Sequence, residues 1–365
     1  MAKTYFPIEN KYDGSEFLNI SFVANDSSLL FSSPIEWRGK LLFKAIKKNR
    51  INTSHLFCYD DFSKGDNVLC EILNSSQLFI LEASLRNDFI EIINFLKSKN
   101  KKVVVDIPYI TDILELTNIQ SNEQKPLSSR LFSSQQVYNS QCIDEKTSFR
   151  WALNLADNIL VTSDKQYEKW QCCTPIKIFP ELFDASALET ISSQEHEITN
   201  LGIFLIGNEI ENIFFEFLEF IDQKFKNVVL NFINIPQFGN SFEISQKIDK
   251  TYQTITDLNQ IQSMDVGVFW DTQLVRGIFT RNILEFLYKK KPIIINNTKG
   301  YLDLAKYGLI IEENQNWKSD FADQILNYNE HSSALENGYL YSISRSVDDN
   351  INPILRHFSE IMKVS

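Results

Sequence analysis

GIFLIGNEIENIFFEFLEFIDQKF, residues 202–225, contains the pattern that decides the fold. Residues 202–206 are continuously apolar, as is typical of a parallel strand covered on both faces of its sheet. From residue 210 onward, apolar side chains recur every three or four positions and form the stripe of an amphipathic helix. The stripe consists of Ile210, Ile213, Phe214, Phe217, Leu218, Ile221 and Phe225. The stretch therefore predicts one strand–helix unit of an α/β domain.

The same alternation of short apolar runs and amphipathic helices recurs along most of the chain. Six strands are predicted in each half. In the first half they cover residues 18–23, 54–58, 78–82, 103–107, 158–162 and 176–179. In the second half they cover residues 202–206, 228–233, 251–255, 265–269, 292–295 and 308–311. Two sets of alternating strands and helices predict an α/β protein with two Rossmann-like domains, each with an open parallel sheet.

The polar segment 184–199 lacks strand character and marks the predicted domain boundary. We expect an N-terminal domain over residues 1–190, a C-terminal domain over residues 191–340, and a final helical segment over residues 341–365 that packs on either domain. Residues 117–141 are rich in Ser, Gln and Asn without periodicity, which is typical of a lid or a disordered segment.

Composition narrows the class of protein. Of the 365 residues, 43% are hydrophobic, as is typical of a globular chain with a sizeable core. The formal net charge of −11 disfavours a nucleic acid partner, because its phosphates would be repelled. The five cysteines are odd in number and irregularly spaced, so we expect reduced thiols in the cytoplasm. No run approaches eighteen apolar residues, and the first residues lack a signal-peptide pattern, so we expect neither a membrane span nor a signal peptide.

Motifs for several enzyme classes are missing from the sequence. The four histidines stand alone, without metal ligands at useful spacing, and no DxD pair occurs. Neither GxGxxG nor GxxxxGK[ST] is present, which excludes the usual dinucleotide and P-loop sites. We therefore expect no metal site and no cofactor.

Several segments, in order, resemble the GT-B glycosyltransferases, particularly the retaining family-four (group 1) enzymes. In the first half they are IEWRGKLLFKAI (35–46), VVVDIPY (103–109), ALNLADNILVTSD (152–164) and PIKIFPELFD (175–184). In the second half they are MDVGVFW (264–270) and TRNILEFLYKKKPIIINNTKGYLDL (280–304). The resemblance implies two Rossmann-like domains with parallel sheets facing across a cleft, the acceptor side first and the nucleotide-sugar donor side second. It also implies a metal-independent, retaining transfer of a sugar to a hydroxyl of a glycan or lipid-linked acceptor.

The start of the helix near Thr280 is the main candidate for the donor site. Thr280 is a suitable N-cap, while Arg276 and Arg281 flank it and no acid lies in the first turn. Cations there oppose the helix dipole, and a bound diphosphate would reverse the sign of that effect. The resemblance extends the donor site to Asn282 and gives Glu285 the ribose hydroxyls. The alternative is an ordinary ion pair between Arg281 and Glu285.

Gly207 and Asn208 end the first strand of the second half, where the backbone could approach the phosphates or the sugar. A simple strand-to-helix turn explains them equally well. The sequence also departs from the family at Gly277, where the family carries the first of two glutamates in the donor site. The second of these is matched by Glu285.

Arg38, Gly39 and Asp106 are the acceptor-side or cleft candidates. The alternatives are a solvated Arg38 and a loop-capping Asp106. The basic stretch from Lys40 to Arg50 (KLLFKAIKKNR) is either a solvated helix face or a peripheral contact with the inner face of the membrane.

Two other functions remain open on the sequence alone. A degenerate donor site fits a non-catalytic GT-B-like partner of an active glycosyltransferase. The GT-B architecture also hosts sugar-nucleotide epimerases, which convert their substrate without an acceptor.

Overall fold

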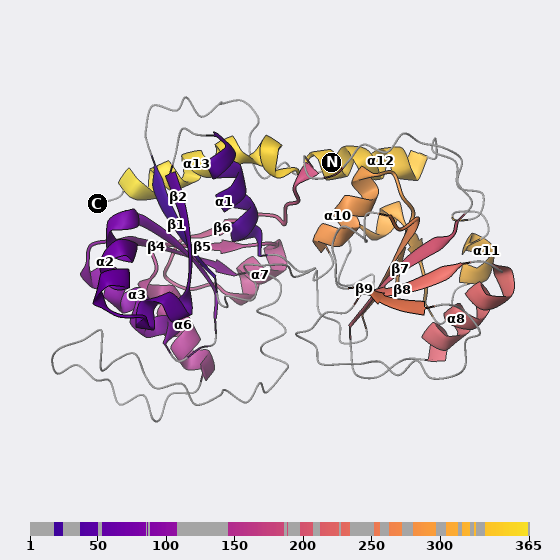
Figure 1. Ribbon diagram of the computed structural model, residues 1–365, viewed down its shortest axis with the longest axis horizontal. Coiled ribbons are helices and arrows are strands. Elements are labelled where there is room, and N and C mark those ends of the chain that lie inside the picture. The colour runs from indigo at the N-terminus through magenta and orange to yellow at the C-terminus, as the bar shows by residue number, and fades with distance from the viewer. Residues whose placement is uncertain are drawn as a thin grey trace. The chain divides into compact units, whose positions relative to one another are not determined.

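The computed structural model describes residues 18–24, 37–49, 53–84, 86, 88–107, 145–185, 188, 198–206, 212–225, 228–233, 252–255, 263–271, 280–296, 304–312, 316–321, 325 and 333–363. These residues form two compact units (Figure 1). Unit 1 contains the described residues up to Leu182 and from Val347 onward, and unit 2 contains those from Phe183 to Ser346. Most of the predicted boundary segment 184–199 and all of segment 117–141 lie outside the described residues.

Unit 1 is built on a parallel sheet of six strands in the order β2-β1-β3-β4-β5-β6. The strands are β1 (Asn19–Ala24), β2 (Thr53–Cys58), β3 (Leu78–Glu82), β4 (Lys102–Ile107), β5 (Asn158–Val161) and β6 (Ile176–Ile178). Each coincides with a predicted strand, and the parallel pairing is also as predicted. The chain reverses its direction of winding between β1 and β3, which makes that pair the topological switch point.

Helices cover both faces of this sheet. One buried cluster joins the sheet to α1 (Arg38–Asn49) and α13 (Val347–Lys363), so the last helix packs on unit 1. A second cluster joins the opposite face to α2 (Asp66–Ser75), α3 (Phe89–Ser98) and α6 (Glu145–Leu155). The short elements η2 (Tyr59–Ser63) and α7 (Asp164–Lys169) follow β2 and β5. Ser163 caps α7 by accepting a hydrogen bond from the Gln166 amide.

Unit 2 has a second parallel sheet in the order β12-β11-β10-β7-β8-β9. The strands are β7 (Asn200–Ile206), β8 (Val229–Ile233), β9 (Tyr252–Ile255), β10 (Val266–Asp271), β11 (Ile293–Ile295) and β12 (Leu309–Ile310). All six coincide with predicted strands. Numbered within the unit and read from the other edge, the order is 3-2-1-4-5-6, the order of dinucleotide-binding Rossmann domains.

Aromatic side chains pack the helices onto both faces of this second sheet. On one face, Trp270 contacts Phe214 and Phe217 of α8 (Asn212–Lys224), and Phe217 contacts Trp317 of α11 (Trp317–Phe321). On the other face, Phe269 contacts Phe286 of α10 (Thr280–Tyr288). Helix α12 (Ser333–Ile343) packs on α10 and on η6 (Ala305–Tyr307). Within the described ranges, no helix is both long and apolar enough to span a bilayer.

Candidate functional site

The carboxyl edge of the unit 2 sheet is where a doubly wound domain binds its ligands, at the switch point of the strand order. The switch point lies between β7 and β10, whose last residues Ile206 and Asp271 are register partners. Gly207 and Asn208 follow β7 directly in sequence, and Arg276 belongs to the segment between β10 and α10. These three residues and Gly277 lie outside the described residues, so their roles stay predictions.

Helix α10 is the next described element after β10 and packs against β10 and β11, so its first residue lies toward the carboxyl edge of these parallel strands. Its buried face consists of Asn282, Ile283, Leu284, Phe286 and Leu287. Close packing requires Gly267 in β10, since a Cβ there would lie 2.7 Å from the Phe269 ring and 3.1 Å from the Phe286 ring. Thr280 is the first residue of the helix, and the first turn contains no acid. The positive end of the α10 dipole therefore lies toward the carboxyl edge of the sheet.

Arg281 and Glu285 are the predicted donor residues that the structure brings together. The guanidinium Nε of Arg281 lies 3.1 Å from Oε1 of Glu285, with side chains 14% and 17% exposed. This is the i,i+4 ion pair that the sequence offers as the alternative to ligand binding. Asn282 is 2% exposed and belongs to the buried face of the helix. The pair holds a guanidinium and a carboxylate together at the edge, where both retain some contact with solvent.

The acceptor-side candidates of unit 1 also meet, but in the interior rather than at an exposed surface. Arg38 and Asp106 form an ion pair with side chains 0% and 2% exposed. The Nε of Arg38 donates to Asp106 Oδ1 at 2.8 Å, and the indole Nε1 of Trp37 donates to Oδ2 at 2.7 Å. Arg38 also donates to the carbonyl of Phe179 and lies over its ring, 5.0 Å from the centroid. The side chain of Arg38 is therefore not solvated, as one prediction had it. It is also not open to a ligand at a surface, as the other prediction required.

Gly39 has a local packing role beside this pair. A Cβ at residue 39 would lie 2.3 Å from the Trp37 ring, which leaves room only for glycine. The Trp37 ring is in turn oriented by its hydrogen bond to Asp106. Gly39 thus allows the contact that completes the buried cluster of Trp37, Arg38 and Asp106.

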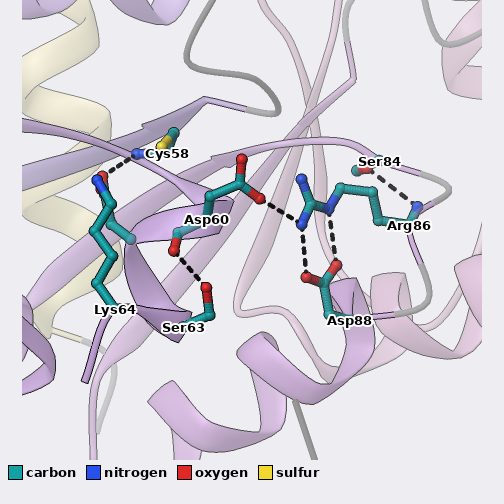
Figure 2. Close-up of polar contacts among 8 residues, drawn as sticks. Cys58, Asp60, Ser63, Lys64, Ser84, Arg86 and Asp88 are labelled. Atoms are coloured by element: carbon teal, nitrogen blue, oxygen red, sulfur yellow. Dashed lines mark hydrogen bonds and ion pairs between the residues drawn. The ribbon is translucent and has the colours of Figure 1, made fainter. Parts of the chain in front are cut away.

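A charged cluster that the sequence patterns did not predict lies at the carboxyl edge of unit 1 and consists of Asp60, Arg86 and Asp88. Arg86, in the segment after β3, donates from Nη2 to Asp60 Oδ1 at 2.8 Å and to Asp88 Oδ2 at 2.9 Å (Figure 2). Its Nε donates to Asp88 Oδ1 at 3.0 Å, which completes a two-point contact. The available signal was the charged residues that closely follow two predicted strands, in YDD (59–61) and LRND (85–88).

Neighbouring groups fix this cluster in place. The Tyr59 hydroxyl donates to the carbonyl of Glu82 at 2.6 Å, and Arg86 lies over the Tyr59 ring, 5.7 Å from its centroid. Burial, and next the charge of Glu82, raise the pKa of Tyr59 well above its ordinary value. Burial alone would lower the pKa of Arg86, but Asp88 and Asp60 outweigh it and raise that pKa. Arg86 therefore remains a cation at every physiological pH.

Among the described residues, no group of three or more His, Cys, Asp or Glu side chains is arranged to hold a metal ion. Cys58, Cys70, Cys172 and Cys173 are free thiols. Burial, followed by the charge of Asp61, raises the pKa of Cys58, which favours the protonated thiol.

Known proteins resemble this chain in fold rather than in sequence. No family model and no curated protein matches it. The structure of Anabaena Alr3699/HepE in complex with UDP-glucose matches with a TM-score of 0.56 and 11% identity, over 94% of this chain and 100% of that one. A glycosyltransferase from Rickettsia africae ESF-5 matches at 0.54 and 16%, over 96% and 100%. The N-terminal domain of Candida albicans trehalose-6-phosphate phosphatase matches at 0.50 and 14%, over 94% and 96%. These matches show that the two Rossmann-like units are of the GT-B type.

Proposed function

We propose that this GT-B chain is a glycosyltransferase that moves a sugar from a nucleotide-diphosphate sugar to a hydroxyl of a glycan or lipid-linked acceptor. The observation that carries the proposal is the carboxyl edge of unit 2. Support comes from the Rossmann strand order and from the first turn of α10, which contains Arg281 and no acid. HepE, a structural neighbour over 94% of this chain, was solved with UDP-glucose. Retention at the anomeric carbon and independence from metal ions belong to the same proposal.

Arg281 would act on the departing nucleoside diphosphate. Its guanidinium and the amides of the first turn of α10 present positive charge where the leaving group gains negative charge, which stabilises the transition state. Glu285 would accept hydrogen bonds from the ribose hydroxyls and would orient Arg281 through the ion pair already present. Arg276, Thr280 and Asn282, together with the backbone at Gly207 and Asn208, would complete the donor site.

A second candidate is a non-catalytic partner of an active glycosyltransferase. The closed ion pair between Arg281 and Glu285 favours this reading because each charge is already balanced without a ligand. Gly277, in place of the family's first donor-site glutamate, favours it as well.

Thermal unfolding of the full chain with UDP, GDP, CDP and dTDP separates the two candidates. A ligand that binds the folded state raises the transition temperature in proportion to the logarithm of its concentration over Kd. The proposal expects at least one of the four diphosphates to raise it, and the matching nucleotide sugar to be consumed in the presence of acceptor. Stabilisation by none of them would leave the non-catalytic partner as the better description.

A further inference from the structure

Charged side chains at the carboxyl edge of unit 1 differ in their access to solvent. Arg38 and Asp106 are buried and paired. In contrast, the side chain of Asp60 is 47% exposed and that of Arg86 is 22% exposed. Asp60 follows β2 and Arg86 follows β3, and β1 lies between these strands in the sheet. The ion pair therefore links the two segments that flank the end of β1, next to the switch point between β1 and β3.

The geometry leaves one carboxylate oxygen of Asp60 available to a ligand. Oδ1 accepts the hydrogen bond from Arg86, while Oδ2 receives none from the described part of the chain. Arg86 is itself held by both oxygens of Asp88 (Figure 2). It also lies over the ring of Tyr59. The Ser63 hydroxyl donates to the Asp60 carbonyl at 2.7 Å and tethers the backbone of the turn. Asp60 is thus a half-exposed carboxylate in a fixed orientation.

The charge of the cluster disfavours anionic ligands. Two carboxylates and one guanidinium give a net charge of −1, so an anionic ligand would be repelled. A neutral polyol suits the cluster, because its hydroxyls can donate to carboxylate oxygens and accept from guanidinium N–H groups.

We propose that Asp60, oriented by Arg86, binds hydroxyl groups of a neutral sugar unit on the acceptor. Asp60 contacts the sugar, and Arg86 and Asp88 are positioning residues. The inference rests on the proposed function and adds to it the acceptor class and the contact that recognises it.

The test measures binding of simple neutral glycosides to the full-length protein by saturation-transfer NMR. The probes are the methyl glycosides of glucose, mannose and galactose, with glucose 6-phosphate and glucuronate as anionic probes. We expect at least one methyl glycoside to bind, and Asp60→Asn to weaken its binding about tenfold, as expected for loss of one charge-assisted hydrogen bond. Asp60→Glu, which keeps the charge, should retain part of the affinity.

Glu71→Gln is the matched control, because Glu71 is an exposed acid on α2 in the same unit. Unchanged glycoside binding in Asp60→Asn, no binding of any neutral glycoside to the wild-type protein, or preference for the anionic probes would each overturn the inference. Nucleotide stabilisation of the same preparations reports on unit 2. A protein stabilised by a nucleotide but unaffected by Asp60→Asn would contradict this inference while leaving the proposed function intact.

Discussion

Arg38 and Asp106 form a buried ion pair across 68 residues of sequence, with side chains 0% and 2% exposed. The pair joins the first residue of α1 to β4 and takes a further hydrogen bond from the indole of Trp37. Its burial makes it a structural element of unit 1.

Asp106→Asn should strongly destabilise unit 1. The substitution leaves the Arg38 guanidinium buried without a counter-charge, and breaking a buried pair from one side costs about 3–5 kcal/mol. Urea unfolding followed by circular dichroism and tryptophan fluorescence measures the change. The double variant Arg38→Met/Asp106→Leu removes both charges and should cost much less. If Asp106→Asn unfolds at the wild-type urea concentration yet loses activity, Asp106 acts in catalysis rather than in folding.

Arg281→Ala should weaken binding of the stabilising nucleoside diphosphate about 10- to 100-fold, because a hydrogen bond to a charged group contributes about 1.5–3 kcal/mol. The folded state should change little, since the lost ion pair is a single i,i+4 pair at the edge of the unit. Titration calorimetry with the diphosphate chosen by the thermal panel measures the affinity. The control is Lys224→Ala, which removes an exposed cation at the C-terminal end of α8 in the same unit. Equal affinities of the wild-type protein and Arg281→Ala would refute the donor-site assignment.

Lys291 should make the protein more stable as the pH rises from about 8 to 10.5. Burial, and next the charge of Lys289, lower the pKa of Lys291 from 10.5 to about 8 in the folded chain. In that window the unfolded chain binds a proton that the folded chain has released, so the free energy of unfolding increases with pH. Urea unfolding at several pH values measures the slope. Lys291→Met should reduce it relative to the wild-type protein, and the exposed Lys224→Met should not. Identical slopes in all three proteins would rule out this role of Lys291.

In the acidic range, His357 should make the protein less stable as the pH falls below about 6.5. Burial, followed by the charge of Lys177, lowers the pKa of His357 from its ordinary 6.5. On acidification the unfolded chain binds the proton first, so stability is lost between 6.5 and the lower folded pKa. Glu360, 3.8 Å from Nδ1, opposes the shift, and Asn158 Oδ1 lies 3.3 Å from Nε2. His357→Gln should flatten this part of the stability profile in thermal unfolding. A variant as acid-sensitive as the wild-type protein would show that other groups dominate.

Local patterns were sufficient to predict the elements of the fold. A parallel strand covered on both faces needs apolar side chains at every position, and an amphipathic helix needs them every third or fourth, so each leaves its own period in the sequence. For the same reason the contact between Arg281 and Glu285 could be predicted, since residues four apart on a helix are neighbours.

Contacts across the sheet could not be predicted in this way. Sequence patterns indicated Arg38 and Asp106 as separate candidates but did not predict that they form a pair. They indicated neither Asp60 nor Arg86. Partners in these pairs come from segments far apart in the chain, and they meet because β1, β2, β3 and β4 are placed side by side.

The amino-acid sequence by itself determined the class of the fold, the position of each strand and the helix that begins at Thr280, because these follow from the periodicity of neighbouring residues. Only the tertiary structure decided which charges are buried against each other and which remain exposed to solvent. That outcome depends on strand order and on the packing of helices over each face, and neither leaves a local pattern in the sequence.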